Sequence, residues 1–306
     1  MTRILLLTGG SGLIGSSLKD QLEEHDYEVR GLTRTPTKAT NNLQWDGIHP
    51  PPKATENIQS LIHLSGQAIF DGIPKLGNRA KIFTSRVEST KKLVDAMKSL
   101  PSGNRPKVFI CASAIGYYGN RGDSILTEEA GPGDGYLSSV CQAWEQEAMK
   151  AESLGIRTVR LRIGVVLSKH GGALSMMLKP FRAGLGGPLG NGRQWFSWIH
   201  IKDLTSLIIE VLRNEDYSGA LNAVAPRPVR NTEFTKSLAK CIGKPAFIRV
   251  PKIALYSLLG PLAGDLLASQ RVIPEKAERL DFKFEFSDVS DALSKEVQNE
   301  PAGFST

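Results

Sequence analysis

The chain has 306 residues, of which 41% are hydrophobic and 23% are charged, a composition that supports a substantial buried core and excludes bulk disorder. Its net charge is +7, but Lys and Arg are spread along the chain, so we expect no nucleic-acid partner. Three cysteines and five histidines are scattered without metal-ligand spacing, which predicts neither a metal site nor a disulfide framework. No apolar run has the length of about 18 residues needed to cross a bilayer, and we expect a cytoplasmic protein without a membrane partner.

Short apolar runs alternate with helical patterns over the first two-thirds of the chain. Ile14, Leu18 and Leu22 are spaced four residues apart, the spacing of one face of a helix. Strands are predicted at residues 4–7, 27–33, 61–64, 107–112 and 158–163, and helices at residues 13–24, 85–100, 137–154 and 203–213. This alternation predicts an α/β fold, a Rossmann-type doubly wound parallel sheet with helices on both faces.

The composition of the sequence changes after Leu167. Residues 171–199 are rich in glycine and aromatic residues, and short helical patterns with prolines dominate from residue 226 onward. We therefore predict a dinucleotide-binding domain from residues 1–170 and 200–225, and a small C-terminal substrate lobe from residues 171–199 and 226–300. Residues 41–55, which contain three consecutive prolines, are expected to form an exposed loop.

A glycine-rich segment follows the first predicted strand and opens the first predicted helix. Gly9 permits a tight turn, Gly12 lets the backbone approach a diphosphate, and Gly15 allows the helix to pack closely on the strand. Free N–H groups at the helix N-terminus then favour an anion. A simple glycine-rich turn is the alternative, but the strand–loop–helix context favours dinucleotide binding. The residues expected at the diphosphate are Gly9, Ser11, Gly12, Leu13, Ile14 and Gly15.

The end of the second predicted strand indicates which dinucleotide is bound. An NAD site has an acidic residue there, which binds the ribose 2′-hydroxyl. Residues 31–35 are instead Gly-Leu-Thr-Arg-Thr, where Arg34 can pair with a 2′-phosphate and Thr33 can donate its hydroxyl. We therefore predict NADP(H) rather than NAD, and a solvated Arg34 on the surface is the alternative.

With these elements placed, the chain resembles the extended, atypical short-chain dehydrogenase/reductases, and within them the epimerase-family subgroup also described as nucleoside-diphosphate-sugar epimerase-like or cell-division-inhibitor-like. The most specific stretches are residues 113–119, 162–167, 180–203, 222–226 and 270–274. The resemblance implies that Leu64, Ser65 and Gly66 line the adenosine side of the cofactor cleft. It also implies that Ser113 is the catalytic Ser/Thr, and that the backbone of residues 164–166, including Val166, walls the nicotinamide.

The chain departs from this family at the proton donor, which is a Tyr with a Lys four residues later. Tyr136 is followed at that spacing by Val140, and a Tyr without a cationic neighbour is a poor acid or base at neutral pH. Arg86 is one candidate substitute, either contacting the cofactor or lowering the pKa of Tyr117 or Tyr118. We therefore place Tyr117 with Ser113 as the candidate catalytic pair, with simple packing of Tyr117 and an exposed, acid-paired Arg86 as the alternatives.

Aromatic and polar residues gather at residues 193–200 and suggest a substrate wall. We predict substrate contacts from Arg193, Trp198 and His200, with packing of the tryptophan and a structural role for the histidine as alternatives. Nucleotide-sugar epimerases commonly carry an Arg seven residues before the Asp that matches Asp203, where this chain has Phe196.

These observations leave three functions open. The first is an NADP-dependent oxidoreductase or epimerase on a small polar or sugar-like substrate. The second is a non-catalytic NADP(H)-sensing or regulatory protein that acts in cell division, which the missing Tyr-x-x-x-Lys supports. A conventional NAD-dependent nucleotide-sugar epimerase is disfavoured by Arg34 and Phe196. Related folds often dimerise through two helices, so a homodimer is also possible.

Overall fold

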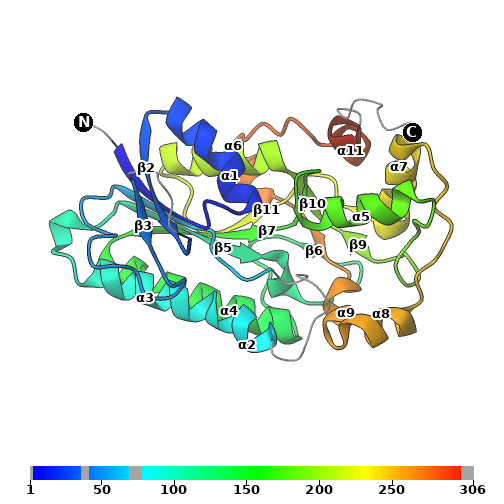
Figure 1. The fold of residues 1–306 in the computed structure, drawn as a ribbon, viewed down its shortest axis with the longest axis horizontal. Coiled ribbons are helices and arrows are strands. Elements are labelled where there is room, and N and C mark those ends of the chain that lie inside the picture. The colour runs from blue at the N-terminus through cyan, green and yellow to red at the C-terminus, as the bar shows by residue number, and fades with distance from the viewer. Residues whose placement is uncertain (1–2, 36–40, 69–77, 298–306) are drawn as a thin grey trace.

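The computed structural model describes residues 3–35, 41–68 and 78–297, and its centre is a seven-stranded parallel sheet (Figure 1). The strand order is β11-β7-β5-β4-β1-β2-β3. The chain runs outward from β1 through β2 to β3, and then returns to β4 on the other side of β1. The strands are β1 (Arg3–Thr8), β2 (Tyr27–Thr33), β3 (Asn42–Gln44), β4 (Ser60–His63), β5 (Val108–Ala114), β7 (Arg157–Ile163) and β11 (Gly219–Ala223). A crevice for a ligand is therefore expected at the carboxyl ends of β1 and β4.

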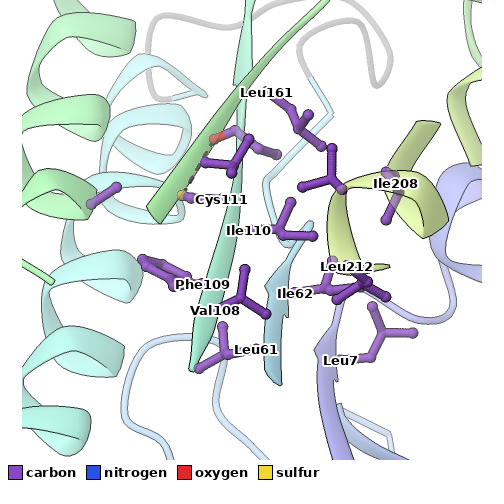
Figure 2. Close-up of a cluster of buried hydrophobic side chains, with 14 of the residues drawn as sticks. Leu7, Leu61, Ile62, Val108, Phe109, Ile110, Cys111, Leu161, Ile208 and Leu212 are labelled. Carbon is purple, nitrogen blue, oxygen red and sulfur yellow. Dashed lines mark hydrogen bonds between the residues drawn. The ribbon is translucent and has the colours of Figure 1, made fainter. Parts of the chain in front are cut away.

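Helices cover both faces of this sheet, as Figure 1 shows. Helices α1 (Leu13–Glu24) and α6 (Ile201–Arg213) pack together on one face, while α3 (Val87–Lys98) and α4 (Tyr136–Met149) pack together on the other, preceded by the short α2 (Asn78–Thr84). Because both faces are covered, the central strands are apolar along most of their length. Their side chains form the main hydrophobic core, in which Leu7, Ile62 and Ile110 face α6 residues such as Ile208 (Figure 2).

A second hydrophobic cluster lies outside the main sheet. Its members come from α5 (Gly172–Arg182), α7 (Asn231–Ile242) and α11 (Val289–Val297), with Trp198 and Phe234 among its fully buried side chains. Short two-stranded sheets also lie outside the main sheet. They pair β8 (Val165–Leu167) with β10 (Trp198–His200), β9 (Trp195–Phe196) with β12 (Val229–Arg230), and β6 (Ile125–Leu126) with β13 (Arg271–Val272). The remaining elements are α8 (Lys252–Leu259), α9 (Leu262–Leu266), α10 (Glu275–Arg279) and the 3₁₀ turns Ser102–Asn104, Ile115–Tyr118 and Glu152–Leu154.

The expectation that residues 41–55 form an exposed loop is wrong. Residues 42–44 form β3, which extends the sheet by pairing with β2, and Trp45 directly after it is only 4% exposed. Ala54 and Thr55 are also buried. This segment therefore belongs to the sheet edge beside the expected crevice. None of the helices in the described ranges is long and apolar enough to cross a membrane.

Candidate functional site

The glycine loop is built into the junction between β1, α1 and the end of β4. Gly9 has a φ of +74°, and a Cβ there would lie 2.8 Å from the carbonyl carbon of Leu64. A Cβ on Gly15 would lie 2.7 Å from the Cα of Gly10 and would also collide with the carbonyl oxygen of Gly9. The backbone N–H of Gly12 donates to that oxygen at 3.0 Å and closes the turn. The loop therefore needs glycine at Gly9 and Gly15. It lies at the N-terminus of α1, where backbone N–H groups favour an anion.

A cleft of about 560 Å³ opens beside this loop, and we call it the first cleft. The structure brings together in it eight of the residues predicted to bind the cofactor: Gly9, Ser11, Gly12, Thr33, Arg34, Leu64, Ser65 and Gly66. These residues come from the ends of β1, β2 and β4, which are adjacent in the sheet. The first cleft therefore lies in the crevice outside the carboxyl ends of these strands, at the point where the strand order reverses.

The other predicted cofactor residues lie around the first cleft rather than in its lining. Gly15 lies beneath the loop, and Ile14 packs against the main core. Leu13 and the backbone of Val166 both lie beside Gly172, because a Cβ on that glycine would be 3.2 Å from the Leu13 side chain and 3.9 Å from the Val166 carbonyl oxygen. A contact of Leu13 and Val166 with the nicotinamide end of a cofactor stays a prediction.

Part of the first cleft comes from segments that the sequence did not indicate. Residues 45–48 line it opposite the glycine loop, and α2 contributes Lys81, a second exposed cation. The side-chain stem of Arg34 runs against Gly47, where a Cβ would be 3.5 Å from the arginine Cδ. Residues 42–44, Asn-Leu-Gln, have little strand preference of their own and three prolines follow closely, so the sequence carried no local signal for this wall.

Asp46 is the acidic residue of this lining, and both of its carboxylate oxygens are engaged. Oδ1 accepts the backbone N–H groups of Ile48 and His49 at 2.7 Å each, and Oδ2 pairs with the imidazole Nδ1 of His49 at 2.8 Å. The hydrogen bond from the His49 side chain, followed by the two backbone bonds, lowers the pKa of Asp46 to about 2. The carboxylate therefore orders its own turn, whereas no acidic residue ends β2 beside Arg34.

Arg86 lies behind the first cleft. Its guanidinium packs against Gly66, where a Cβ would be 3.1 Å from Cζ, and lies 5.3 Å from the Trp144 ring centroid. It donates to the backbone carbonyls of Gln67 and Ile82 at 3.0 and 3.3 Å. Burial lowers the pKa of this arginine. The exposed, acid-paired Arg86 considered from the sequence is therefore wrong, and the side chain supports the wall at Gly66.

The hydroxyl of Ser113, the predicted catalytic serine, points into a buried polar network. Ser113 is 4% exposed, and its Oγ donates to Glu145 Oε1 at 2.7 Å. The same carboxylate accepts from Arg162 Nε at 2.9 Å and from Nη2 at 3.0 Å. Ser113 is not among the residues that line the first cleft. In this structure its hydroxyl helps to satisfy a buried ion pair, and its role in catalysis stays a prediction.

The two adjacent tyrosines differ in their environments. Tyr118 is fully buried, donates to Asn222 Oδ1 at 2.6 Å and has its pKa raised to about 12 by burial. Tyr117 is half-buried, and the guanidinium of Arg162 lies 3.7 Å from its ring centroid. Of the two, Tyr117 is the better candidate for contact with a substrate. The cation beside it is Arg162 rather than Arg86, which the sequence did not suggest.

Two of the three predicted substrate residues are placed in the interior, so those predictions are corrected. Trp198 has no exposed surface and donates its indole N–H to the carbonyl of Arg227 at 3.1 Å. His200 is 1% exposed and its Nε2 lies 3.0 Å from Glu296 Oε1, a carboxylate contributed by α11. An aromatic ring with no exposed surface cannot wall a cleft, and at 1% exposure His200 is likewise placed in the interior. Arg193, by contrast, is exposed and lines a separate cleft.

Comparisons with known proteins agree with this geometry. The model of the "NAD dependent epimerase/dehydratase family" matches residues 5–223, and that of a "Domain of unknown function (DUF1731)" matches residues 250–296. The chain is 38% identical to the chloroplastic "Epimerase family protein SDR39U1 homolog" of Arabidopsis thaliana, covering 95% of this chain and 86% of that protein. It is 36% identical to "Epimerase family protein SAR0825" of Staphylococcus aureus, with 94% and 97% covered.

Two solved structures are similar over nearly the whole chain. Human epimerase family protein SDR39U1 (isoform 2), crystallised with NADPH, gives a TM-score of 0.86 at 30% identity and covers 97% of this chain and 100% of that one. The nucleoside-diphosphate sugar epimerase of Corynebacterium glutamicum gives 0.80 at 34% identity, covering 97% of this chain and 58% of that one. This chain belongs to the NAD-dependent epimerase/dehydratase family and shares the Rossmann-type fold of the atypical extended short-chain dehydrogenase/reductases.

Proposed function

We propose that this protein binds NADP(H) in the first cleft and acts as an oxidoreductase or epimerase on a small polar or sugar-like substrate. The observation that carries the proposal is the position of Arg34, which lies in the same cleft as Gly9 and Gly12 at the end of β2. A guanidinium there suits a 2′-phosphate, which it can bind with two parallel hydrogen bonds. The human relative that was crystallised with NADPH supports the same cofactor.

Charge in the first cleft favours NADP(H) over NAD. Arg34 and Lys81 are both exposed cations of the lining, while the carboxylate of Asp46 is held by its own turn. A 2′-phosphate adds about two negative charges and three acceptor oxygens, as phosphate groups do elsewhere in proteins. NAD offers only a hydroxyl at this position, which these cations bind weakly.

The chemistry proposed for the chain's own residues centres on Tyr117. A bound nicotinamide supplies hydride transfer. Tyr117 lies in the turn that follows β5, next to the carboxyl end of the sheet, and its ring rests on Arg162. We infer that its hydroxyl donates a hydrogen bond to a substrate oxygen, while the guanidinium of Arg162 against its ring fixes the orientation of the side chain.

A second function is favoured by two observations. The Ser113 hydroxyl is committed to Glu145, and Tyr136, which donates to the carbonyl of Arg79, is followed four residues later by Val140 instead of Lys. Both parts of the family's usual proton-transfer machinery are thus altered. This supports a protein that holds or senses NADP(H) without turnover.

Cofactor selectivity tests the binding proposal. Fluorescence titration with NADPH and NADH is expected to give tighter binding of NADPH by about ten- to a hundredfold, the effect of one or two charge-assisted hydrogen bonds. Arg34→Ala should remove most of this preference, whereas Lys98→Ala, at the end of α3 and outside the first cleft, should preserve it. Equal affinity of the wild-type protein for both cofactors would contradict the proposal.

Turnover separates the two candidate functions. A panel of carbonyl compounds, incubated with NADPH and monitored by absorbance, should reveal oxidation of NADPH that Tyr117→Phe reduces while NADPH affinity is unchanged. Tight NADPH binding with no turnover across the panel would favour the sensing function instead.

A further inference from the structure

Helix α8 (Lys252–Leu259) carries apolar side chains on all of its sides, yet most of them are exposed. Its sequence is Lys-Ile-Ala-Leu-Tyr-Ser-Leu-Leu, and only Leu255 is buried. Ile253 is 81% exposed, and Tyr256 and Leu258 are exposed as well. A helix that is hydrophobic all round is normally buried inside a protein. The outer side of α8 therefore lacks an apolar partner among the residues that the structure describes.

Further exposed apolar side chains lie in the segment before α8. Phe247 is 77% exposed and is followed by Ile248, which is exposed too. The backbone N–H of Ile248 donates to the carbonyl of Gly186 at 3.2 Å, so this segment lies beside the exposed Leu185. In Figure 1 the segment runs along one end of the molecule, from α7 to α8. We call the exposed apolar surface at this end the α8 face; it consists of Leu185, Phe247, Ile248, Ile253, Tyr256 and Leu258.

Every residue of the α8 face lies in a stretch of sequence that has no acidic residue. Residues 153–202 contain eight Lys and Arg and no Asp or Glu, and residues 234–264 contain five Lys and Arg and no Asp or Glu. Because the net charge of the chain is only +7, the remainder is net negative. The exposed apolar surface and the excess positive charge therefore belong to the same parts of the chain.

Cations lie between and beside the apolar side chains of the α8 face. Lys244, Arg249 and Lys252 belong to the same chain segment, and all three are exposed. Within the described ranges, no acidic side chain forms an ion pair with any of them. The next acidic residue along the chain, Asp265, is half-buried on α9, and its carboxylate accepts the backbone N–H of Leu137 in the first turn of α4. The α8 face thus has a cationic border whose charges are not compensated.

Charge distinguishes the partners that could cover the α8 face. A second copy of the chain would bring the same cationic, acid-free surface to a two-fold interface, where like charges would oppose each other. The surface of an anionic lipid bilayer instead offers negative headgroups to the cations and an apolar phase to side chains such as Phe247 and Ile253. Tyr256 suits the level between the two, where amphipathic aromatic rings are enriched. Charge complementarity therefore favours a lipid surface over a second copy.

We propose that the α8 face binds the surface of a membrane that contains anionic lipids, without crossing it. Phe247 and Ile253 enter the boundary between the headgroups and the acyl chains. Lys244, Arg249 and Lys252 pair with the headgroup phosphates. The net negative charge of the rest of the chain orients this end of the molecule toward the lipid. The expectation of no membrane partner rested on the lack of an apolar run long enough to cross a bilayer, and binding at the surface needs no such run.

Flotation of the full-length protein with lipid vesicles tests the proposal. Vesicles of phosphatidylglycerol and phosphatidylcholine in equal amounts should bind the protein, whereas vesicles of phosphatidylcholine alone should not. Salt at about 0.5 M should release most of the bound protein, because it screens the headgroup charges. Phe247→Gln and Ile253→Gln should each weaken binding about tenfold through the loss of buried apolar surface. Arg249→Gln should weaken it about fivefold, the effect of one cation near an anionic surface.

The matched controls lie outside the α8 face. Met149→Gln removes an exposed apolar side chain from α4, and Lys98→Gln removes an exposed cation from α3. Both variants should bind the vesicles as the wild type does. All of the substituted side chains are exposed, and circular dichroism verifies that the variants fold.

The double variant with both Phe247→Gln and Ile253→Gln separates the proposal from its alternatives. No binding of the wild type to the anionic vesicles, or equal binding of the double variant, would overturn the proposal. Sedimentation velocity without lipid should give the same oligomeric state for both proteins. An oligomer that dissociates in the double variant would instead show that a second copy covers the α8 face. Polyglutamate serves as an acidic polypeptide probe, and binding as tight as that of the vesicles, with the same loss in the double variant, would assign the face to an acidic protein.

Discussion

The buried ion pair between Glu145 and Arg162 is expected to depend on both partners, because removing either one leaves the other charge buried without a counterion. Both side chains are 4% exposed, and the carboxylate accepts from Arg162 Nε at 2.9 Å and from Nη2 at 3.0 Å. Burial alone lowers the pKa of Arg162, but its bonds to Glu145 outweigh this and hold the pKa above its ordinary value. A guanidinium is not deprotonated in proteins, so Arg162 stays charged when its partner is neutralised. Glu145→Gln keeps the shape of the side chain but leaves that charge without a counterion.

The expected cost follows from this burial. Breaking a buried pair by neutralising one partner destabilises proteins by about 3–5 kcal/mol, because the remaining charge stays desolvated. The more distant Arg160, whose Nη1 lies 3.9 Å from Glu145 Oε2, adds little. Against a total stability of about 5–15 kcal/mol for a typical protein, the loss is large. The more exposed pair of Glu147 with Lys150, whose side chains are 16% and 57% exposed, provides the control, and Glu147→Gln should cost less than about 1 kcal/mol.

Urea denaturation followed by circular dichroism measures both variants. Glu145→Gln should lower the denaturation midpoint markedly while Glu147→Gln leaves it nearly unchanged. NADPH affinity of Glu145→Gln, measured under native conditions, should match the wild type because Glu145 lies outside the first cleft. A Glu145→Gln protein as stable as the Glu147→Gln control would refute the argument that this buried pair depends on both partners.

Three further changes have defined outcomes. Gly15→Ala should weaken NADPH binding at least about tenfold, because its Cβ would displace the glycine loop, whereas Gly103→Ala, whose Cβ meets nothing within 4 Å, should leave titrations unchanged. Burial lowers the pKa of His63 to about 3. As the pH falls, the unfolded chain therefore binds a proton near pH 6.5, whereas the folded protein does not. The free energy of unfolding therefore has its full value above pH 6.5 and falls by about 2 kcal/mol toward pH 5. His63→Gln should flatten this dependence, whereas the exposed control His170→Gln should not. Denaturation measured across this pH range tests both variants. Trp198→Leu should reduce stability by about 2–4 kcal/mol while NADPH affinity persists, and a selective loss of NADPH affinity would restore the tryptophan to a site wall.

Much of the nucleotide-binding half could be predicted because its signals are local. The helix predicted at residues 13–24 and the strand predicted at residues 27–33 have the same bounds as α1 and β2. Their apolar periodicity and the glycine loop between β1 and α1 act over a few residues. Three of the six loop residues that were predicted to meet a cofactor, Gly9, Ser11 and Gly12, lie together in the first cleft.

What could not be predicted depends on partners distant in sequence. β3 has only three residues, and its strand conformation is supplied by pairing with β2. The Ser113 hydroxyl is directed away from a cleft by Glu145, 32 residues later on α4. Trp198 lies in an aromatic cluster whose composition is the same for a substrate wall and for a core, so only the packing of α5, α7 and α11 decides between them.

A crystal structure with bound NADPH tests the central claim most directly. The account predicts the diphosphate against the backbone of Gly9 and Gly12, and the 2′-phosphate within hydrogen-bond distance of the Arg34 guanidinium. Asp46 should remain bonded to its own turn, with both oxygens engaged as they are here. A 2′-phosphate that lies away from Arg34, or a cofactor bound outside the first cleft, would contradict the account.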